Sequence, residues 1–337
     1  MNSSIRATNS VNHLLLPGSP MSDAPALELP FPSRLSPHRA DAEARHRRWL
    51  DAHAMLGSRL GAAGYTRWDV PGLASLSYPD CEPDELALAT DLMGFYFLFD
   101  DQFDGPLGRR PAQVAAICDE LTGVLQGRHP SHLLSPCTRA FEDLWQRITD
   151  GMSDRWRARA AYNWEWYFAS HPAEAAGRLG GQPPDREGYL ILRRGTAAME
   201  TVLDMVERVG RFEVAPAAFH CPQLRQLRQL AADIPSLTND VRSYPQEASR
   251  GDVNNLVMIV QRERGCTLQE AGSAVLAEAQ QMVRRFTQLT DELPRTYREL
   301  ELRLDERQTA QRYADGLSAW LTGYLDWEMS TGRYRAA

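Results

Sequence analysis

The stretch DDQFD at residues 100–104 and the apolar run LMGFYFLF at residues 92–99 before it decide how this chain is interpreted. Three carboxylates at the end of an apolar helix are costly to desolvate unless cations neutralise them. Hard divalent cations, above all Mg²⁺, favour such oxygens. Because positions i and i+4 share a helix face, Asp100 and Asp104 can point the same way, with Asp101 about 100° round. The pattern predicts an apolar cavity with a metal site at its rim.

Acidic clusters at helix ends are more often solvated surface, and a short motif of this kind carries a real risk of a false match. The aromatic run before the cluster weighs against that interpretation. A second oxygen-rich segment farther along the chain weighs against it as well.

The second segment is NDVRSYPQE at residues 239–247. Asn239, Ser243 and Glu247 are spaced i, i+4 and i+8, so on a helix they form one stripe that drifts by about 40° per step. An amide oxygen, a hydroxyl and a carboxylate make a suitable site for a hard cation. Asn and Ser are poor residues for a helix interior, and Pro245 removes a backbone donor. A frayed helix end with ordinary polar side chains is therefore the competing interpretation of this segment.

Taken together, the two segments are more specific than either alone. Two oxygen-rich faces on separate helices can hold several Mg²⁺ ions, and a polyanion must then bridge the ions to balance the charge. A diphosphate is the natural candidate, because metal ions that clamp the oxygens of a leaving group promote its departure.

Composition narrows the class of protein. The chain has 337 residues, 43% of them hydrophobic, with a net charge of −7 and no long basic run, so nucleic acid is not an expected partner. No apolar stretch reaches the roughly 18 residues of a membrane span, and the leucines at 14–16 are too few for a signal peptide. The cysteines are odd in number and form no CxxC pair, which indicates a reduced cytoplasm and neither a disulfide framework nor a zinc site. They are Cys81, Cys118, Cys137, Cys221 and Cys266.

The chain reads as helical from about residue 40 almost to its end, with turn residues between the helical segments. The expected helices span 40–62, 83–101, 110–126, 137–149, 153–170, 186–210, 222–249, 267–291 and 305–330. No stretch has the alternation of a strand, and no internal repeat is visible. We therefore expect one all-α domain of about nine or ten helices at 37–337, after a flexible tail at 1–36 in which Met21 is an alternative start.

With these motifs in place, the chain resembles the bacterial class I terpene synthases from about residue 29 to residue 334. Residues 100–104 resemble the family's DDxxD motif, and residues 239–247 resemble its NDxxSxxxE motif. Arg333-Tyr334 is similar to its terminal Arg-Tyr pair. The segment YLILRR at 189–194 is similar to the one that carries the diphosphate-sensing arginine. Within the family, the set is similar to that of pentalenene synthases and cadinane-type sesquiterpene synthases.

The resemblance implies the class I terpenoid synthase fold, a single antiparallel helical bundle around a hydrophobic cavity. It also implies three Mg²⁺ at the cavity mouth, with Mn²⁺ as an alternative ion. Asp100 would then bridge two ions, and Asp104 would support the same site directly or through water. Asp101 would make an ion pair or a hydrogen bond that helps closure.

The resemblance assigns the third ion to Asn239, Ser243 and Glu247, with Asp240 in a supporting role. It assigns diphosphate binding to Arg193, Arg333 and Tyr334. Arginine suits this role because its planar fork matches phosphate geometry.

Three places in the chain bear on how closely it follows the family pattern. Thr196 can stand as the linker residue after the sensor, but Ala197 replaces the glycine whose carbonyl helps ionisation in relatives. A backbone carbonyl survives that change. Gln246 stands where some relatives have a lysine that contacts diphosphate, so one charge contact is missing. Pro245 is not foreign to the family, which weakens the objection to a helix there.

The cavity must be dry and able to close, because water would quench the carbocation formed when an allylic diphosphate ionises. Aromatic faces stabilise such a cation without attacking it. Tyr96 and Phe97 lie one turn before Asp100, and Trp327 resembles an aromatic residue of the cavity contour in relatives. Core packing is the usual role of such side chains, but we expect Phe97 and Trp327 to line the cavity on the strength of the resemblance.

Three other functions fit the sequence less well. A chain-elongating prenyl diphosphate synthase would carry a second aspartate-rich motif, where this chain has Asn, Ser and Glu. A protonation-initiated cyclase would need a DxDD string, which does not occur. A non-catalytic helical binding protein would not need both metal clusters and the arginine set.

The sequence thus predicts a Mg²⁺-dependent lyase that ionises farnesyl diphosphate and cyclises the cation to a sesquiterpene hydrocarbon or alcohol. Geranylgeranyl diphosphate and a diterpene product are the alternative, because cavity depth decides chain length. A homodimer is suggested by the resemblance alone.

Overall fold

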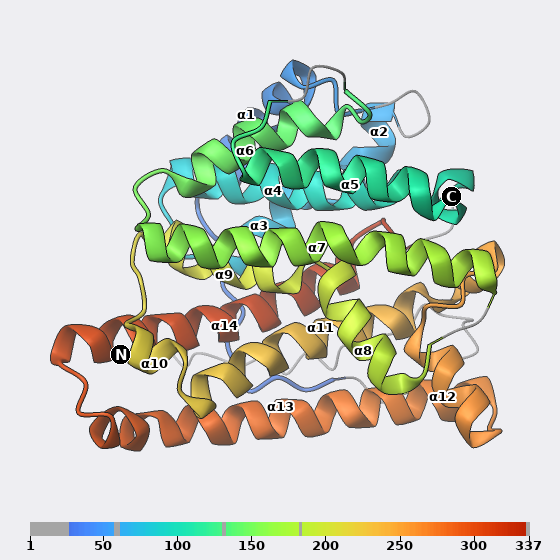
Figure 1. The fold of residues 1–337 in the computed structure, drawn as a ribbon. Helices are drawn as coiled ribbons and strands as arrows, with labels where there is room; N and C mark the ends of the chain where they lie inside the picture. Colours follow the sequence, from blue (N-terminus) through green and yellow to red (C-terminus); the bar gives the residue numbers. More distant parts are fainter. Residues whose placement is uncertain (1–26, 57–60, 130–132, 182–183, 335–337) are drawn as a thin grey trace, which may run out of the picture.

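The computed structural model in Figure 1 is a bundle of helices, many of which run side by side. The structure describes residues 27–56, 61–129, 133–181 and 184–334, and in these ranges it contains helices and loops but no strand. The α-helices in the first half are α1 (Arg39–Ala52), α2 (Gly61–Thr66), α3 (Val70–Ser77), α4 (Pro83–Asp101), α5 (Pro111–Leu125), α6 (Cys137–Thr149) and α7 (Asp154–Gly180). The others are α8 (Arg186–Thr196), α9 (Met199–Gly210), α10 (Pro216–Phe219), α11 (Pro222–Arg250), α12 (Leu256–Arg264), α13 (Leu268–Glu299) and α14 (Leu304–Ser330), and a short 3₁₀ helix, η1, spans Pro106–Arg109.

The prediction of an all-α fold is confirmed, and the expected helices at 83–101 and 137–149 have the bounds of α4 and α6. The expected helix at 186–210 is two helices, because Ala198 adopts the left-handed conformation with φ of 58° and breaks the chain between α8 and α9. The periodicity in the sequence did not predict η1 or the short helices α3, α10 and α12, and it covered only the first two residues of α2. It also ended α7 about ten residues early, because that helix continues past Pro172.

Residues 27–36 belong to the bundle rather than to a free tail. The Phe31 ring packs edge-on against Phe286 of α13, with 5.5 Å between ring centroids. The backbone N–H of Ser36 donates to the Ser75 carbonyl of α3 over 3.0 Å. The rest of the expected tail, residues 1–26, lies outside the described residues.

Helix pairs build the bundle and place the site. The most extensive pairings join α11 with α13, α5 with α7, α3 with α14, and α1 with α4. In Figure 1, α5 and α7 cross the upper half of the view and α13 its lower edge, with α14 and α11 between them. An aromatic cluster formed by Phe95, Phe141 and Trp164 ties α4, α6 and α7 together, with 4.7 Å between the last two rings.

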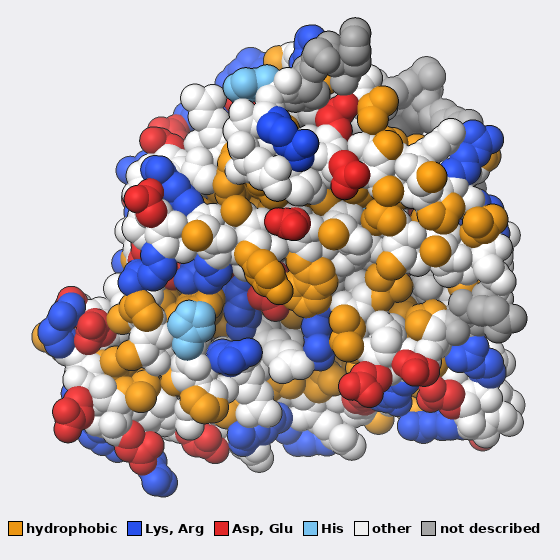
Figure 2. All heavy atoms as spheres, in the orientation of Figure 1, with side chains coloured by type: hydrophobic (Ala, Val, Ile, Leu, Met, Phe, Trp, Pro, Cys, Tyr) orange, Lys and Arg blue, Asp and Glu red, His pale blue; other side chains and the backbone are white. Residues whose placement is uncertain are grey.

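Figure 2 shows charged side chains of both signs spread over the outer face of the bundle. None of the described helices combines the length and the apolar character that crossing a membrane requires.

Candidate active site

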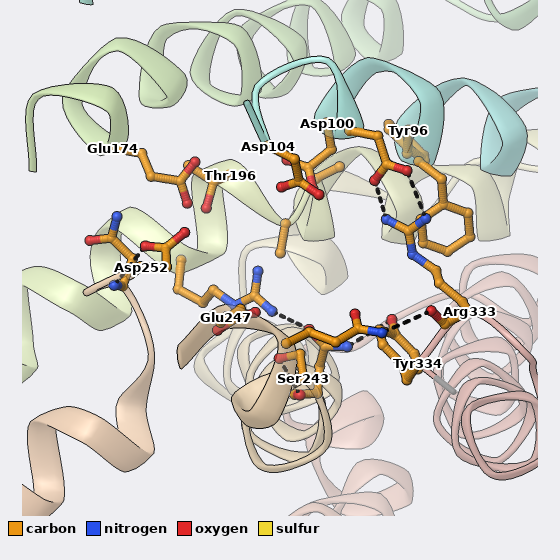
Figure 3. Close-up of a pocket in the computed structure, with 18 of the residues that line it drawn as sticks. Tyr96, Asp100, Asp104, Glu174, Thr196, Ser243, Glu247, Asp252, Arg333 and Tyr334 are labelled. Atoms are coloured by element: carbon orange, nitrogen blue, oxygen red, sulfur yellow. Dashed lines mark hydrogen bonds and ion pairs between the residues drawn. The ribbon is translucent and has the colours of Figure 1, made fainter. Parts of the chain in front are cut away.

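A cavity of about 250 Å³ opens between the C-terminal ends of α4 and α11, the middle of α7, the α8–α9 break and the segment after α14. Residues from both sequence motifs line it. Figure 3 shows Asp100 and Asp104 on one side of this space and Ser243 and Glu247 on the other, with Arg333 and Tyr334 entering from the flank. The fold therefore brings the two predicted segments face to face, although more than 130 residues separate them.

The aspartate-rich motif does not continue one helix as we expected. Helix α4 ends at Asp101, and Asp104 lies in the turn that follows, where its N–H donates to the Asp101 carbonyl. Asp100 and Asp104 nevertheless both line the cavity. The turn thus brings Asp104 to the cavity beside Asp100, as helical spacing was expected to do. Asp104 forms an ion pair with Arg250 at the end of α11, which links the first motif to the helix that carries the second.

The Asp101 carboxylate has a different role, as the sequence suggested. It receives two N–H groups of the Arg333 guanidinium at 3.2 and 2.5 Å, a two-point contact. This ion pair fastens the segment after α14 to the end of α4.

The second motif lies on α11, which runs through Pro245 without ending. Asn239 Oδ1 accepts from Arg193 Nη2 at 2.6 Å, and its Nδ2 donates to the Tyr334 hydroxyl at 2.8 Å. The Ser243 hydroxyl donates to the Asn239 carbonyl, which leaves its oxygen lone pairs for another partner. Glu247 Oε2 accepts from Asn255 Nδ2 at 2.8 Å. A cation at Asn239 Oδ1 would thus compete with the Arg193 guanidinium.

Arg193 is held by Asp240, the residue that we expected to support the site. Its Nε lies 3.2 Å from Asp240 Oδ1, and the other Asp240 oxygen accepts from the Tyr189 hydroxyl and from the Leu256 N–H. Asp240 itself does not line the cavity. Asp240 therefore orients the Arg193 side chain from outside the cavity.

Several carboxyl groups around the cavity hold their protons more tightly than usual. Burial, together with the nearby Glu174 and Asp104 charges, raises the pKa of Asp100 to about 7. Burial likewise raises the pKa of Glu247 to about 8, with Asp240 adding to the effect, and that of Glu328 to about 7. Each shift arises mainly because burial makes the charged carboxylate costly, although Arg193 acts against it at Glu247 and Arg242 at Glu328.

The residues fit a divalent metal. The donor set is carboxylate, amide and hydroxyl oxygen, which suits Mg²⁺. In the described parts of the chain, no three His, Cys, Asp or Glu side chains come close enough together to hold one ion. Asp100 and Asp104 on one wall and Asn239, Ser243 and Glu247 on the other are instead two half-sites, which a bridging anion could complete.

A buried histidine stands behind the first half-site. His171 Nδ1 bonds to the Tyr167 carbonyl at 2.8 Å, and Nε2 lies 3.8 Å from Asp100 Oδ1 with no hydrogen-bond partner. Burial lowers the pKa of His171, so the imidazole is neutral at pH 7. Nothing in the sequence pattern had pointed to this residue.

The apolar wall differs from the prediction at one position. Tyr96, Phe97, Thr196 and Ala197 line the cavity as expected. Trp327 does not, because it is fully buried behind Phe97, whose ring stacks on it with 5.4 Å between centroids. The prediction that Trp327 lines the cavity is therefore wrong, and the residue supports the wall from behind.

The structure adds lining residues that the sequence analysis missed. Gln246, which the sequence analysis had already named, also lines the cavity. Its side-chain amide donates to the Arg333 carbonyl over 3.4 Å. All 37 basic residues are arginine, so the lysine of some relatives has no counterpart anywhere in this chain. Arg250 could have been found as the cation one turn after Glu247, whereas the others are brought in by tertiary contacts. The missed residues are Trp68, Tyr167, Glu174, Arg178, Ala198, Met199, Arg250, Asp252, Asn254 and Tyr324.

Comparison with known proteins agrees with this geometry. Residues 91–285 match the family model described as "Terpene synthase family 2, C-terminal metal binding". Pentalenene synthase of Streptomyces avermitilis is 36% identical, over 91% of this chain and 92% of its own length. Pristinol synthase of Streptomyces pristinaespiralis is 33% identical, over 94% of this chain and 87% of its own.

A solved structure shows a stronger likeness. The crystal structure of germacradien-4-ol synthase from Streptomyces citricolor superposes with a TM-score of 0.85 and 58% sequence identity, covering 91% of this chain and 98% of that one.

Proposed function

This chain belongs to the terpene synthase family, and on that premise we propose that it cyclises farnesyl diphosphate to a sesquiterpene with release of diphosphate. The observation that carries the proposal is the pairing of two oxygen-rich half-sites across the mouth of one cavity whose inner wall is apolar and aromatic. The enzyme class is that of a lyase acting on a carbon–oxygen bond to phosphate.

We assign the polar residues to the diphosphate end of the substrate. Arg193, Arg333 and Tyr334 bind the diphosphate oxygens, and the Asp101–Arg333 ion pair holds the mouth closed around them. Arginine forks are suited to this because they present two parallel donors to a phosphate. Asp100 and Asp104 on one side, and Asn239, Ser243 and Glu247 on the other, hold the metal.

We further propose that three Mg²⁺ ions are held there, with Mn²⁺ as an alternative ion. The support is the family resemblance and the oxygen donors of the two facing half-sites, where burial makes the charged forms of Asp100 and Glu247 costly and a bound cation would offset that cost. Bound Mg²⁺ supplies Lewis-acid neutralisation of the departing diphosphate.

The residues beyond the mouth act on the hydrocarbon. Phe97 and Tyr96 present aromatic faces that stabilise a carbocation without forming a bond to it. The α8–α9 break brings the backbone at Ala197 and Ala198 to the cavity surface, in the position that the resemblance assigns to helping ionisation. The Tyr96 hydroxyl is occupied with Thr201 Oγ1 at 2.6 Å, so it is held away from the cation.

Two observations favour a fifteen-carbon substrate and an alcohol product. The cavity of about 250 Å³ lies just below the range of about 300–1,000 Å³ usual for ligand pockets, which favours farnesyl over the longer geranylgeranyl diphosphate. The relative at 58% identity is named for germacradien-4-ol, an alcohol. We therefore propose that water captures the final cation.

The assembly and its compartment are proposed on separate grounds. A homodimer is proposed on the family resemblance. A cytoplasmic location is proposed because the five cysteines are free, four of them buried, as suits a reducing compartment.

The test is incubation of the purified protein with Mg²⁺ and, separately, geranyl, farnesyl and geranylgeranyl diphosphate. Products are identified by gas chromatography–mass spectrometry, with a chelator control and a parallel incubation in H₂¹⁸O. We expect one cyclic fifteen-carbon alcohol from farnesyl diphosphate. Its hydroxyl oxygen should carry ¹⁸O from the labelled water, and its formation should stop when the chelator is added. A longer linear diphosphate formed with added isopentenyl diphosphate would overturn the proposal in favour of chain elongation.

A further inference from the structure

The segment after α14 that carries Arg333 is fastened to the turn between α2 and α3. The N–H of Gly332 donates to the Arg67 carbonyl over 2.8 Å. The Trp68 carbonyl accepts twice, from Thr331 Oγ1 at 2.8 Å and from Trp327 Nε1 at 2.7 Å. A Cβ at position 332 would lie 2.9 Å from the Arg67 carbonyl oxygen, so this close approach requires glycine.

The side chain of Trp68 then forms one wall of the space that Arg333 occupies. The guanidinium carbon of Arg333 lies 4.3 Å from the centroid of the Trp68 ring and 4.5 Å from that of Phe97. Asp101 fixes the guanidinium from a third direction. A guanidinium between two aromatic faces is attracted by both and loses much of its freedom to swing.

A buried polar chain holds Trp68 in its turn. The Tyr65 ring packs on Trp68 with 5.2 Å between centroids, and the Tyr65 hydroxyl bonds to His46 Nε2 at 2.7 Å. His46 Nδ1 bonds to Asp91 at 2.9 Å, and Asp91 pairs with Arg147 of α6 at 2.9 Å.

Helix α4 makes room for this chain at Gly94. A Cβ there would lie 2.5 Å from the Tyr65 hydroxyl oxygen and from the His46 ring. The contacts therefore connect α6, α4, α1 and α2 to the aromatic face beneath Arg333.

We propose that Trp68 is a positioning residue for Arg333, and that the turn at residues 67–68 is the platform that presents this guanidinium to a diphosphate group. The inference rests on the proposed function, which supplies the diphosphate. It goes further by assigning a role to a residue outside every motif in the sequence. Trp68 acts through Arg333 and need not touch the substrate.

The test uses inorganic diphosphate with saturating Mg²⁺, measured by titration calorimetry on the whole chain. Loss of a desolvated cation–π contact predicts that Trp68→Leu weakens diphosphate binding by about 5- to 30-fold. Trp68→Phe keeps an aromatic face and should recover most of the affinity. In an Arg333→Gln background, Trp68→Leu should cause no further loss, because the group that it positions is gone.

Phe212→Leu is the matched control. The Arg312 guanidinium lies over the Phe212 ring at 4.3 Å, the same distance as in the Trp68 pair, but neither residue lines the cavity. This variant should leave diphosphate affinity unchanged. If Trp68→Leu does not fold, Tyr65→Phe removes only the hydroxyl contact to His46 and should weaken diphosphate binding by a few-fold.

Two outcomes would overturn the inference and leave the proposed function standing. One is wild-type affinity in Trp68→Leu. The other is an equal loss with and without Arg333. Failure of the wild-type protein to bind diphosphate with Mg²⁺ and to turn over farnesyl diphosphate would instead overturn the proposed function.

Discussion

Two clusters of buried charge in this bundle differ in how well their charges are balanced. The rear cluster packs α4, α7, α9 and α11 together, and each of its carboxylates accepts from an arginine. Its pairs are Glu85 with Arg208 and Arg211, Glu200 and Asp204 with Arg228, and Glu207 with Arg159. Burial still raises the pKa of Glu207 to about 7, so pairing rather than an ordinary pKa distinguishes this cluster.

The mouth cluster, around the cavity, is organised differently. Asp100 lies near a neutral histidine, Glu247 accepts from an amide, and Glu328 accepts from a tyrosine and an amide. A second oxygen of Glu328 is buried without a hydrogen-bond partner. Buried charges held in direct ion pairs fix a structure, whereas buried carboxylates whose charged forms stay costly favour a cationic ligand. The comparison predicts that changes at the mouth affect chemistry and that changes at the rear affect folding.

The largest effect is expected from Asp100→Asn. Removing the carboxylate that faces the metal should lower turnover of farnesyl diphosphate by about 10³-fold or more, because the leaving group loses its electrostatic stabilisation. The folded protein should be at least as stable as the wild type, since a desolvated carboxylate is gone. Asn239→Ala should act in the same direction. Turnover is measured by diphosphate release, and thermal unfolding is measured in parallel.

Asp204→Asn is the control for that experiment, because Asp204 is also a buried aspartate but lies in the rear cluster. It should destabilise the protein while leaving turnover per folded molecule within a few-fold of the wild type. Undiminished turnover in Asp100→Asn would contradict the metal model.

A large loss of stability is expected from Arg228→Met. This change removes the guanidinium that Glu200 and Asp204 share and leaves Asp204 only Arg159, at 3.5 Å, which should cost about 3–5 kcal/mol in the free energy of unfolding. Urea denaturation measures it. Arg250→Met is the matched change at the mouth, where the Arg250 side chain is 49% exposed, and its ion pair with Asp104 should contribute under about 1 kcal/mol. Equal losses at both positions would break the comparison.

The pH dependence of stability should distinguish the metal-free from the loaded protein. The folded pKa values of Glu247 and Glu328, about 8 and about 7, lie above the value of about 4.3 for an unfolded glutamate. The folded state therefore binds more protons than the unfolded state between these values, and stability is lost as the pH rises through 7 and 8. The melting temperature without metal should fall by several degrees between pH 5.5 and 8.5.

Saturating Mg²⁺ and diphosphate should remove much of this fall, because bound cations favour the charged carboxylates. Glu247→Gln should flatten the dependence in metal-free protein. A melting temperature that rises with pH in the absence of metal would contradict the assignment.

The smallest effect is expected from Gln246→Lys, which restores the cation that some relatives have. It should tighten binding of Mg²⁺ and diphosphate by about 3- to 10-fold, because a charged donor makes a stronger contact with phosphate than an amide does. Ala248→Lys places the same charge on the exposed face of α11 and should change the affinity little. Equal effects of the two lysines would indicate a general rather than a local action of charge.

The sequence by itself determined the fold class and most of the polar groups at the mouth. Helical periodicity is a local property, so it could be seen without knowing any tertiary contact. The donor atoms of Asp100, Asn239, Ser243 and Glu247 identify the chemistry by their type, and their spacing places them on two faces. The resemblance implied an ion pair or a hydrogen bond for Asp101, and the structure shows an ion pair whose partner, Arg333, was not predicted.

Only the tertiary structure decided which groups meet. Trp327 lies behind the cavity wall because α14 packs against α3, whereas Phe97 on α4 faces the cavity. Helical periodicity cannot distinguish these two aromatic positions. The break between α8 and α9 requires a left-handed backbone conformation at Ala198. The residue type does not indicate it, because alanine rarely adopts that conformation. Trp68 and Arg333 are 265 positions apart in the sequence. They meet because the carbonyls of Arg67 and Trp68 accept hydrogen bonds from the segment after α14. Local patterns identify chemical groups, whereas long-range packing decides which of them come together.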